Sequence, residues 1–114
     1  MQYSIETVLD IGNEEFYRAA RYQIPLSVLL INSRDKNIFD ILEELLRPTD
    51  IIQQITHELI VVFLTHTNIE NANTFVNNIK EHVNFSATVD EYKGFKVEFI
   101  ENLFTDNQQT MKVS

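Results

Sequence analysis

The side chains that could do acid–base or metal chemistry are few in this sequence, and their spacing does not favour such chemistry. The pairs Glu14–Glu15 and Glu43–Glu44 could supply a general acid and a general base, but adjacent side chains on a helix diverge by about 100°. His57 and Glu58 are also adjacent and point to opposite faces if extended, so with His66 they make a weak metal site. No cysteine is present to act as a nucleophile or metal ligand. We therefore expect no catalytic residue, no metal and no cofactor, and we expect that the protein is not an enzyme.

Composition and charge indicate a compact globular protein. The chain has 114 residues, of which 44% are apolar and 23% charged, with two glycines and two prolines, so we expect one domain over residues 1–114. The formal net charge of -8 repels nucleic acids and anionic membranes. The first ten residues lack the basic start and apolar core of a signal peptide, and no apolar run approaches the roughly 20 residues of a membrane span. We expect a cytoplasmic protein with no nucleic-acid or membrane partner.

The spacing of apolar residues predicts the order strand, helix, strand, strand, helix, strand over residues 24–92. The second helix begins where Thr67 and Glu70 stand at capping-box spacing, and the first ends before Pro48. The predicted elements are a continuously apolar, central strand at 24–31, a helix at 37–47, a hairpin within 50–64, a helix at 68–82, and a strand with one polar face at 85–90.

This order is the ferredoxin-like βαββαβ motif, an antiparallel sheet with strands one and three central and both helices on one face. Residues 4–22 come before it as a helix that Gly12 and Asn13 interrupt, so that Asn13 can cap the second piece. After Gly94 the pattern fits a helix or an edge strand, and we expect a helix. The predicted fold class is α+β, ferredoxin-like with an added N-terminal helix. Because many unrelated proteins share this fold, it names no function.

Several short segments resemble, in order, the GGDEF family of diguanylate cyclases. RAARYQIPLS at 18–27 is similar to the family consensus RAxRYGxPLS. Arg47 and Asp50 match the RxxD motif that lies five residues before the family's signature. FLTHTNIENA at 63–72 is similar to LLPxTDxExA, and FSATV at 85–89 resembles the final strand. The resemblance covers about residues 16–92 and implies a nucleotide-cyclase-like fold. It places the signature at the hairpin turn, on Thr56, His57, Glu58, Leu59 and Ile60.

The departures from the family pattern imply that cyclase activity is lost. Cyclases of this family hold divalent metals on one carboxylate from the end of strand one and another from the signature turn. Here the first-strand positions are Asn32 and Arg34, and the turn position is Leu59. Thr56 and His57 replace two glycines that let the backbone approach phosphates. The interval between strand one and the RxxD motif is also too short for the segment that binds guanine. The resemblance therefore implies a degenerate, inactive domain.

The RxxD motif is the one retained feature that could bind a ligand. In the family such a pair binds cyclic di-GMP, because a guanidinium can fork to phosphate or guanine and a carboxylate can accept guanine N–H groups. The resemblance thus implies a cyclic di-GMP site at Arg47 and Asp50. The alternative is a solvated helix end, where the helix dipole favours arginine and turn chemistry favours aspartate.

We therefore expect an inactive GGDEF-like signalling or regulatory domain, which either binds cyclic di-GMP or acts through a protein partner or self-association. The other interpretation is an unrelated ferredoxin-like module for protein interaction or small-ligand binding.

Overall fold

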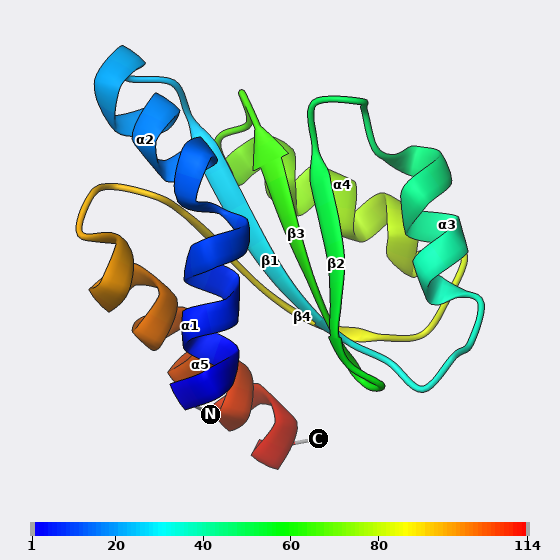
Figure 1. Ribbon diagram of the computed structural model, residues 1–114. Helices are drawn as coiled ribbons and strands as arrows, with labels where there is room; N and C mark the ends of the chain where they lie inside the picture. The colour runs from blue at the N-terminus through cyan, green and yellow to red at the C-terminus, as the bar shows by residue number, and fades with distance from the viewer. Residues whose placement is uncertain (1, 114) are drawn as a thin grey trace.

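The computed structural model describes the backbone of residues 2–113 and the side chains of residues 4–109. Within these limits five helices and four strands follow one another (Figure 1). In chain order they are α1 (Gln2–Ile11), α2 (Asn13–Tyr22), β1 (Leu26–Asn32), α3 (Ile38–Leu45), β2 (Ile51–Thr56), β3 (Leu59–Thr65), α4 (Ile69–Lys80), β4 (Ser86–Glu91) and α5 (Lys96–Val113). In the described residues no helix is both long and apolar enough to cross a membrane.

The four strands form one antiparallel sheet in the order β2-β3-β1-β4. This is the predicted ferredoxin-like topology, and β1 and β3 are central as expected. Every residue of β3 is buried, and in β1 only Asn32 at the end is partly exposed. Their unbroken apolar sequences follow from this position, because helices cover both faces of the two central strands.

One face of the sheet is covered by α3 and α4, as the sequence predicts. Their apolar sides meet Leu29 and Ile31 of β1 and Ile60 and Val62 of β3. The buried residues of this first layer are Leu29, Ile31, Ile38, Leu42, Ile60, Val62, Leu64, Ala72, Val76, Ile79 and Val83.

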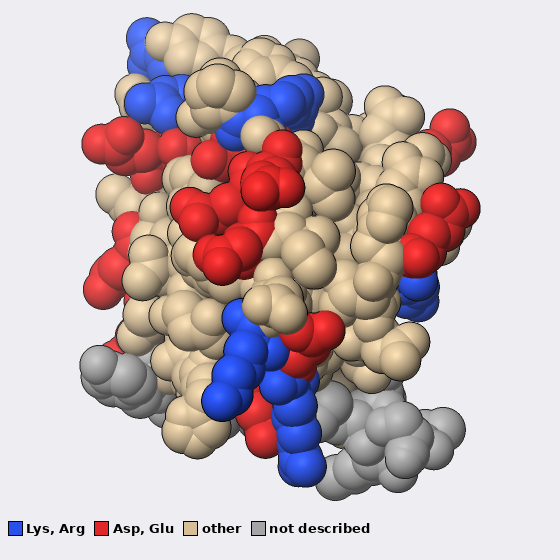
Figure 2. Space-filling view, turned by 90° about the vertical axis from the view of Figure 1, so that its right-hand side faces the viewer, with Lys and Arg blue, Asp and Glu red and all other residues tan. Residues whose placement is uncertain are grey.

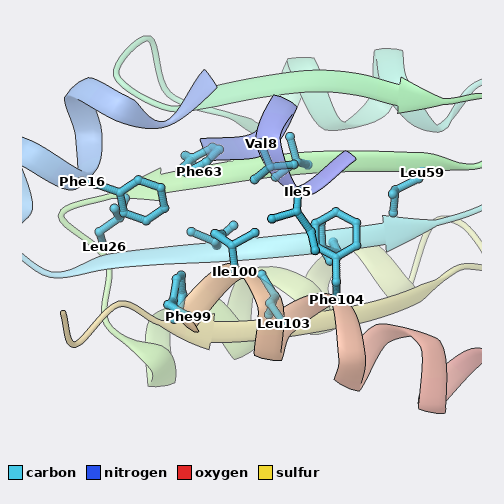
Figure 3. Packing of buried hydrophobic residues seen from close by; sticks show 13 residues of the cluster. Ile5, Val8, Phe16, Leu26, Leu59, Phe63, Phe99, Ile100, Leu103 and Phe104 are labelled. Atoms are coloured by element: carbon cyan, nitrogen blue, oxygen red, sulfur yellow. The ribbon is translucent and has the colours of Figure 1, made fainter. Parts of the chain in front are cut away.

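The opposite face is covered by α1, α2 and α5. The predicted N-terminal helix and the C-terminal helix α5 therefore pack on the same face of the sheet. Figure 3 shows side chains from these helices meeting those of β1 and β3, with Phe16 beside Phe63 and Ile100 above the sheet. The rings of Phe16 and Phe63 meet edge to face at 5.6 Å between centroids. Residues after Gly94 therefore form a helix, and Phe99, Ile100 and Leu103 are on its buried side.

The predicted break in the N-terminal helix falls at Gly12, where α1 ends and α2 begins. A Cβ atom on Gly12 would lie 2.2 Å from Cε2 of Phe63, so only glycine fits against this ring. The prediction that Asn13 caps α2 is wrong, since Asn13 is the first helical residue and no side-chain cap is made. Its Oδ1 instead accepts a hydrogen bond from Lys96 Nζ at 3.2 Å, which joins α2 to α5.

One predicted detail at the start of α4 also differs. Asn68, not Thr67, caps α4, and its Oδ1 accepts from the Asn71 amide at 2.9 Å. β4 has the predicted polar face, on which Asp90 is exposed and Thr88 is half-buried beneath α5, where Asn107 donates to Thr88 Oγ1 at 3.2 Å. The amide of Ile69 at the start of α4 donates to Glu91 Oε1 at 2.9 Å.

Candidate functional site

Arg47 and Asp50 face each other across the turn that follows α3. Arg47 Nε lies 3.1 Å from Asp50 Oδ2 and Nη2 lies 3.0 Å from Oδ1, a bidentate pair. The backbone amide of Arg47 also donates to Asp50 Oδ2 at 3.0 Å. The motif spacing therefore builds a closed turn, in which one carboxylate holds both the main chain and the side chain of the residue three positions before it.

The Asp50 carboxylate is also tied to the end of β3. Its side chain is 2% exposed. Oδ1 accepts from the Thr65 amide at 3.1 Å and lies 3.4 Å from Thr65 Oγ1. A guanine N–H group could reach this carboxylate only by displacing one of these donors. The ligand role of Asp50 stays a prediction, and its contacts in the structure are structural ones.

The Arg47 guanidinium makes more contacts than a purely solvated helix end requires. Nη2 donates to the carbonyl of Thr65 and to Thr67 Oγ1, the latter at 2.9 Å. The hydrogen bond that the Arg47 guanidinium donates to the Asp50 carboxylate raises the pKa of Arg47 above its ordinary value. The side chain is still 51% exposed, and Nη1 has no hydrogen-bond partner among the described residues. This nitrogen could meet an incoming anion.

The surroundings of the pair are acidic. A hollow of about 250 Å³ lies beside it, lined by Glu43, Leu46, Pro48 and Ile52. Figure 2 shows acidic side chains gathered over the middle of this side of the molecule, with basic ones above and below. Exposed acids on α3 are Asp40, Glu43 and Glu44. An anionic ligand would therefore meet one half-exposed guanidinium within a negative field.

The predicted signature turn lies at the other end of the β2–β3 hairpin. Thr56 is the last residue of β2 and pairs with Leu59, so the turn itself is only His57 and Glu58. The Glu58 amide lies 3.3 Å from Thr56 Oγ1, which accepts its hydrogen bond. Leu59 and Ile60 are 9% and 2% exposed and belong to the core. The side chains at the last two signature positions are therefore buried and cannot contact a ligand that approaches from solvent.

Glu58, the one carboxylate of this turn, is paired with a cation from the chain itself. Its Oε1 lies 3.0 Å from Nε of Arg34, which follows β1, and its backbone carbonyl accepts from the Ser33 amide at 3.1 Å. The Arg34 side chain is 87% exposed, so the ion pair adds little stability. The ion pair does bring the turn and the end of β1 together. Its cation, Arg34, stands where the cyclases that the sequence resembles have an acid.

Asn32 at the end of β1 is held by a residue that the sequence did not single out. Asn107 of α5 donates from Nδ2 to Asn32 Oδ1 at 2.6 Å, and Asn107 is 5% exposed. The two positions are 75 residues apart. Helical spacing could have placed Asn107 on the buried side of α5, because it continues the face formed by Ile100 and Leu103.

His57 and His66 lie at the two ends of β3, so the weak metal site considered from sequence is not brought together. The seven residues of β3 separate them by about 20 Å at the rise of an extended strand. In the part of the chain that the structure describes, no group of three or more His, Cys, Asp or Glu side chains could hold a metal ion.

Comparison with known proteins identifies the fold. No family model matches the chain, and no curated protein does. The structure is similar to one described as the crystal structure of a DGC protein from Thermotoga maritima, with a TM-score of 0.66 and 17% sequence identity over 92% of each chain. DGC abbreviates diguanylate cyclase. At this level of identity the similarity shows the fold: the chain has a GGDEF-like fold, the one that the short sequence segments predicted.

Proposed function

We propose that this protein is a catalytically inactive GGDEF-like domain with a signalling or regulatory role, exerted through contact with another protein chain. The observation that carries the proposal is the arrangement at the ends of β1 and of the hairpin. Asn32 is bonded to Asn107, Arg34 is paired with Glu58, and Leu59 is buried.

The chemistry of phosphoryl transfer supports this proposal. Metal ions that bridge nucleotide phosphates need hard anionic oxygen ligands, and most of the catalysis comes from positioning and charge neutralisation. Glu58, the acid of this turn, forms an ion pair with Arg34. Threonine and histidine side chains occupy the positions where a phosphate-binding turn needs glycine.

The test is an assay with GTP and magnesium or manganese, in which cyclic di-GMP is detected by chromatography. We expect no product above a control without enzyme, while an active cyclase assayed in parallel confirms the conditions. Product that appears with the wild type and disappears with Glu58→Gln would contradict the proposal.

A second candidate is that the domain still binds cyclic di-GMP at Arg47. The half-exposed guanidinium, oriented by Asp50 and with Nη1 unpaired in the described structure, favours it. Isothermal titration calorimetry with cyclic di-GMP tests it directly, with Arg21→Ala as a control for losing one exposed arginine. Heat of binding that is lost in Arg47→Ala and kept in Arg21→Ala supports this candidate. If the wild type gives no heat with cyclic di-GMP at high micromolar concentration, this candidate is rejected and contact with another protein remains the proposed role.

A further inference from the structure

The two edges of the sheet differ in how they are protected. Among the strands that the structure describes, β2 is hydrogen-bonded to β3 alone, and Figure 1 shows it as the last strand on the side of α3. β4, the other edge, carries Asp90 and Glu91, and α5 packs along it through the bond between Asn107 and Thr88. Charges and covering helices are the usual means by which proteins prevent strand pairing at an edge. β4 has both of them.

β2 has no charged residue among its six positions, which read IIQQIT. Proline and glycine are absent too, and isoleucine and threonine favour extended backbone. Ile51, Ile52 and Ile55 are only partly buried, although they pack against the two cores. Gln53, between them, is exposed. A bulge between Gln54 and Thr56 shortens the regular part of β2, but an uncharged edge of this composition is still a template for another strand.

We propose that β2 pairs with β2 of a second copy of this chain, antiparallel across a two-fold axis, and extends the sheet through both molecules. This inference does not depend on the loss of catalysis. A two-fold axis perpendicular to the sheet keeps each face continuous with the same face of the partner. Only residues of the same face can then stand opposite each other.

A pairing centred on Gln53 satisfies this condition. It places Gln53 opposite Gln53 of the partner subunit, where two side-chain amides can donate and accept in both directions. Ile51 then lies near the partner's Ile55, the extra residue at the bulge of β2. Both isoleucines pack on the core under α1, α2 and α5. The pairing therefore buries isoleucine surface that is partly exposed in a single copy. The strand is thus complementary to itself, which favours a second copy over an unrelated segment.

The interface is small, because it consists of one six-residue strand from each copy. Interfaces of this size give weak association that depends on concentration. The net charge of -8 on each chain opposes dimerisation, and added salt screens this repulsion. The dimer should therefore become more stable as the salt concentration rises. A dimer held by opposite charges would show the reverse.

Sedimentation equilibrium of the full chain, from low micromolar to near-millimolar concentration, tests the proposal. The key variant is Gln53→Lys, which places two like charges opposite each other at the axis. We expect its dimer dissociation constant to rise by about fivefold or more. The matched control is Asn77→Lys on the exposed side of α4. It makes the same change in net charge away from the edge and should leave the dissociation constant unchanged.

Amide hydrogen exchange of the wild type gives a second measurement, which needs no variant. In the dimer the outward-facing amides of residues 51–56 should become protected as concentration rises, and amides of β4 should not. A wild type that is monomeric throughout would overturn the proposal and leave this edge to an extended segment of another protein. Equal weakening by both lysine variants, or protection confined to another element, would also overturn it.

Discussion

The Asp50 carboxylate accepts a hydrogen bond from the backbone amide of Thr65 at 3.1 Å. Thr65 is the last residue of β3 and Asp50 immediately precedes β2, so this bond closes the open end of the hairpin. The same carboxylate holds the Arg47 guanidinium and the Arg47 amide. The residues that the motif marks for ligand binding are therefore part of the framework of the fold.

The first prediction is that Asp50→Ala strongly destabilises the protein. Removing a buried carboxylate leaves the Thr65 amide and the Arg47 side chain without their acceptor, which costs about 2–4 kcal/mol. Urea unfolding measures the loss. Glu101→Ala, which removes an exposed acid from α5, is the control and should change the free energy of unfolding by less than about 0.5 kcal/mol. Similar losses in the two variants would contradict a structural role for Asp50.

The second prediction concerns Arg47. Arg47→Ala should lower the free energy of unfolding by about 1–2 kcal/mol, because charge-assisted bonds to Asp50 and bonds to Thr65 and Thr67 are lost from a half-exposed site. Arg47→Lys should recover only part of this, since an ammonium cannot reproduce the planar fork. Thermal and urea unfolding give the comparison. If Arg47→Ala unfolds like the wild type, the bonds across the turn add no stability.

Local patterns in the sequence predicted the elements well because each depends on neighbouring residues. The apolar runs of β1 and β3 indicated two central strands, since both of their faces are covered. The sequence singled out Arg47 and Asp50 through the motif, and the structure adds that the two side chains meet within one turn.

Contacts between distant segments could not be predicted in the same way. The hydroxyl of Thr67 matches a capping box in the sequence, but it accepts from Arg47 and donates to the Thr65 carbonyl at 2.8 Å. Asn68 caps the helix in its place. The bond between Asn107 and Asn32 likewise depends on how α5 returns across the sheet. Such pairings follow from tertiary packing, which a short sequence window does not contain.

The third prediction is a pH dependence at the start of α4. The hydrogen bond from the Ile69 amide, with help from Lys93, holds the pKa of Glu91 below its ordinary value. A carboxylate whose folded pKa is lowered stabilises the protein above its unfolded pKa of about 4.3 and loses that contribution as pH falls through the folded value. Glu91→Gln should therefore cost about 1 kcal/mol at pH 7 and progressively less below about pH 4.

Unfolding curves collected over this pH range test the sign. Glu98→Gln, an exposed acid in the first turn of α5, is the control for removing one carboxylate from a helix start. A difference between the wild type and Glu91→Gln that stays constant down to the lowest pH would show that the charge of Glu91 is not what supports α4.

The last prediction concerns Gly12, which the sequence marks only as an interruption. Its backbone has φ of -92°, which any residue can adopt, so backbone conformation does not require glycine here. The Phe63 ring is what requires glycine, because a Cβ atom on residue 12 would lie 2.2 Å from Cε2 and 2.4 Å from Cζ of this ring. Gly12→Ala should therefore cost about 1–3 kcal/mol through overpacking of the core between α1, α2 and the sheet.

A double-mutant cycle separates this cause from the others. Phe63→Leu shortens the side chain that the new methyl group would strike, so Gly12→Ala should cost clearly less in that background than in the wild type. Gly94→Ala is the matched control. Gly94 has φ of 110° and open space around it, so alanine there is strained through the backbone alone, and its cost should be the same with Phe63 or Leu. If the cost of Gly12→Ala is also the same with Phe63 and with Leu at that position, the helix break requires the glycine and the ring does not.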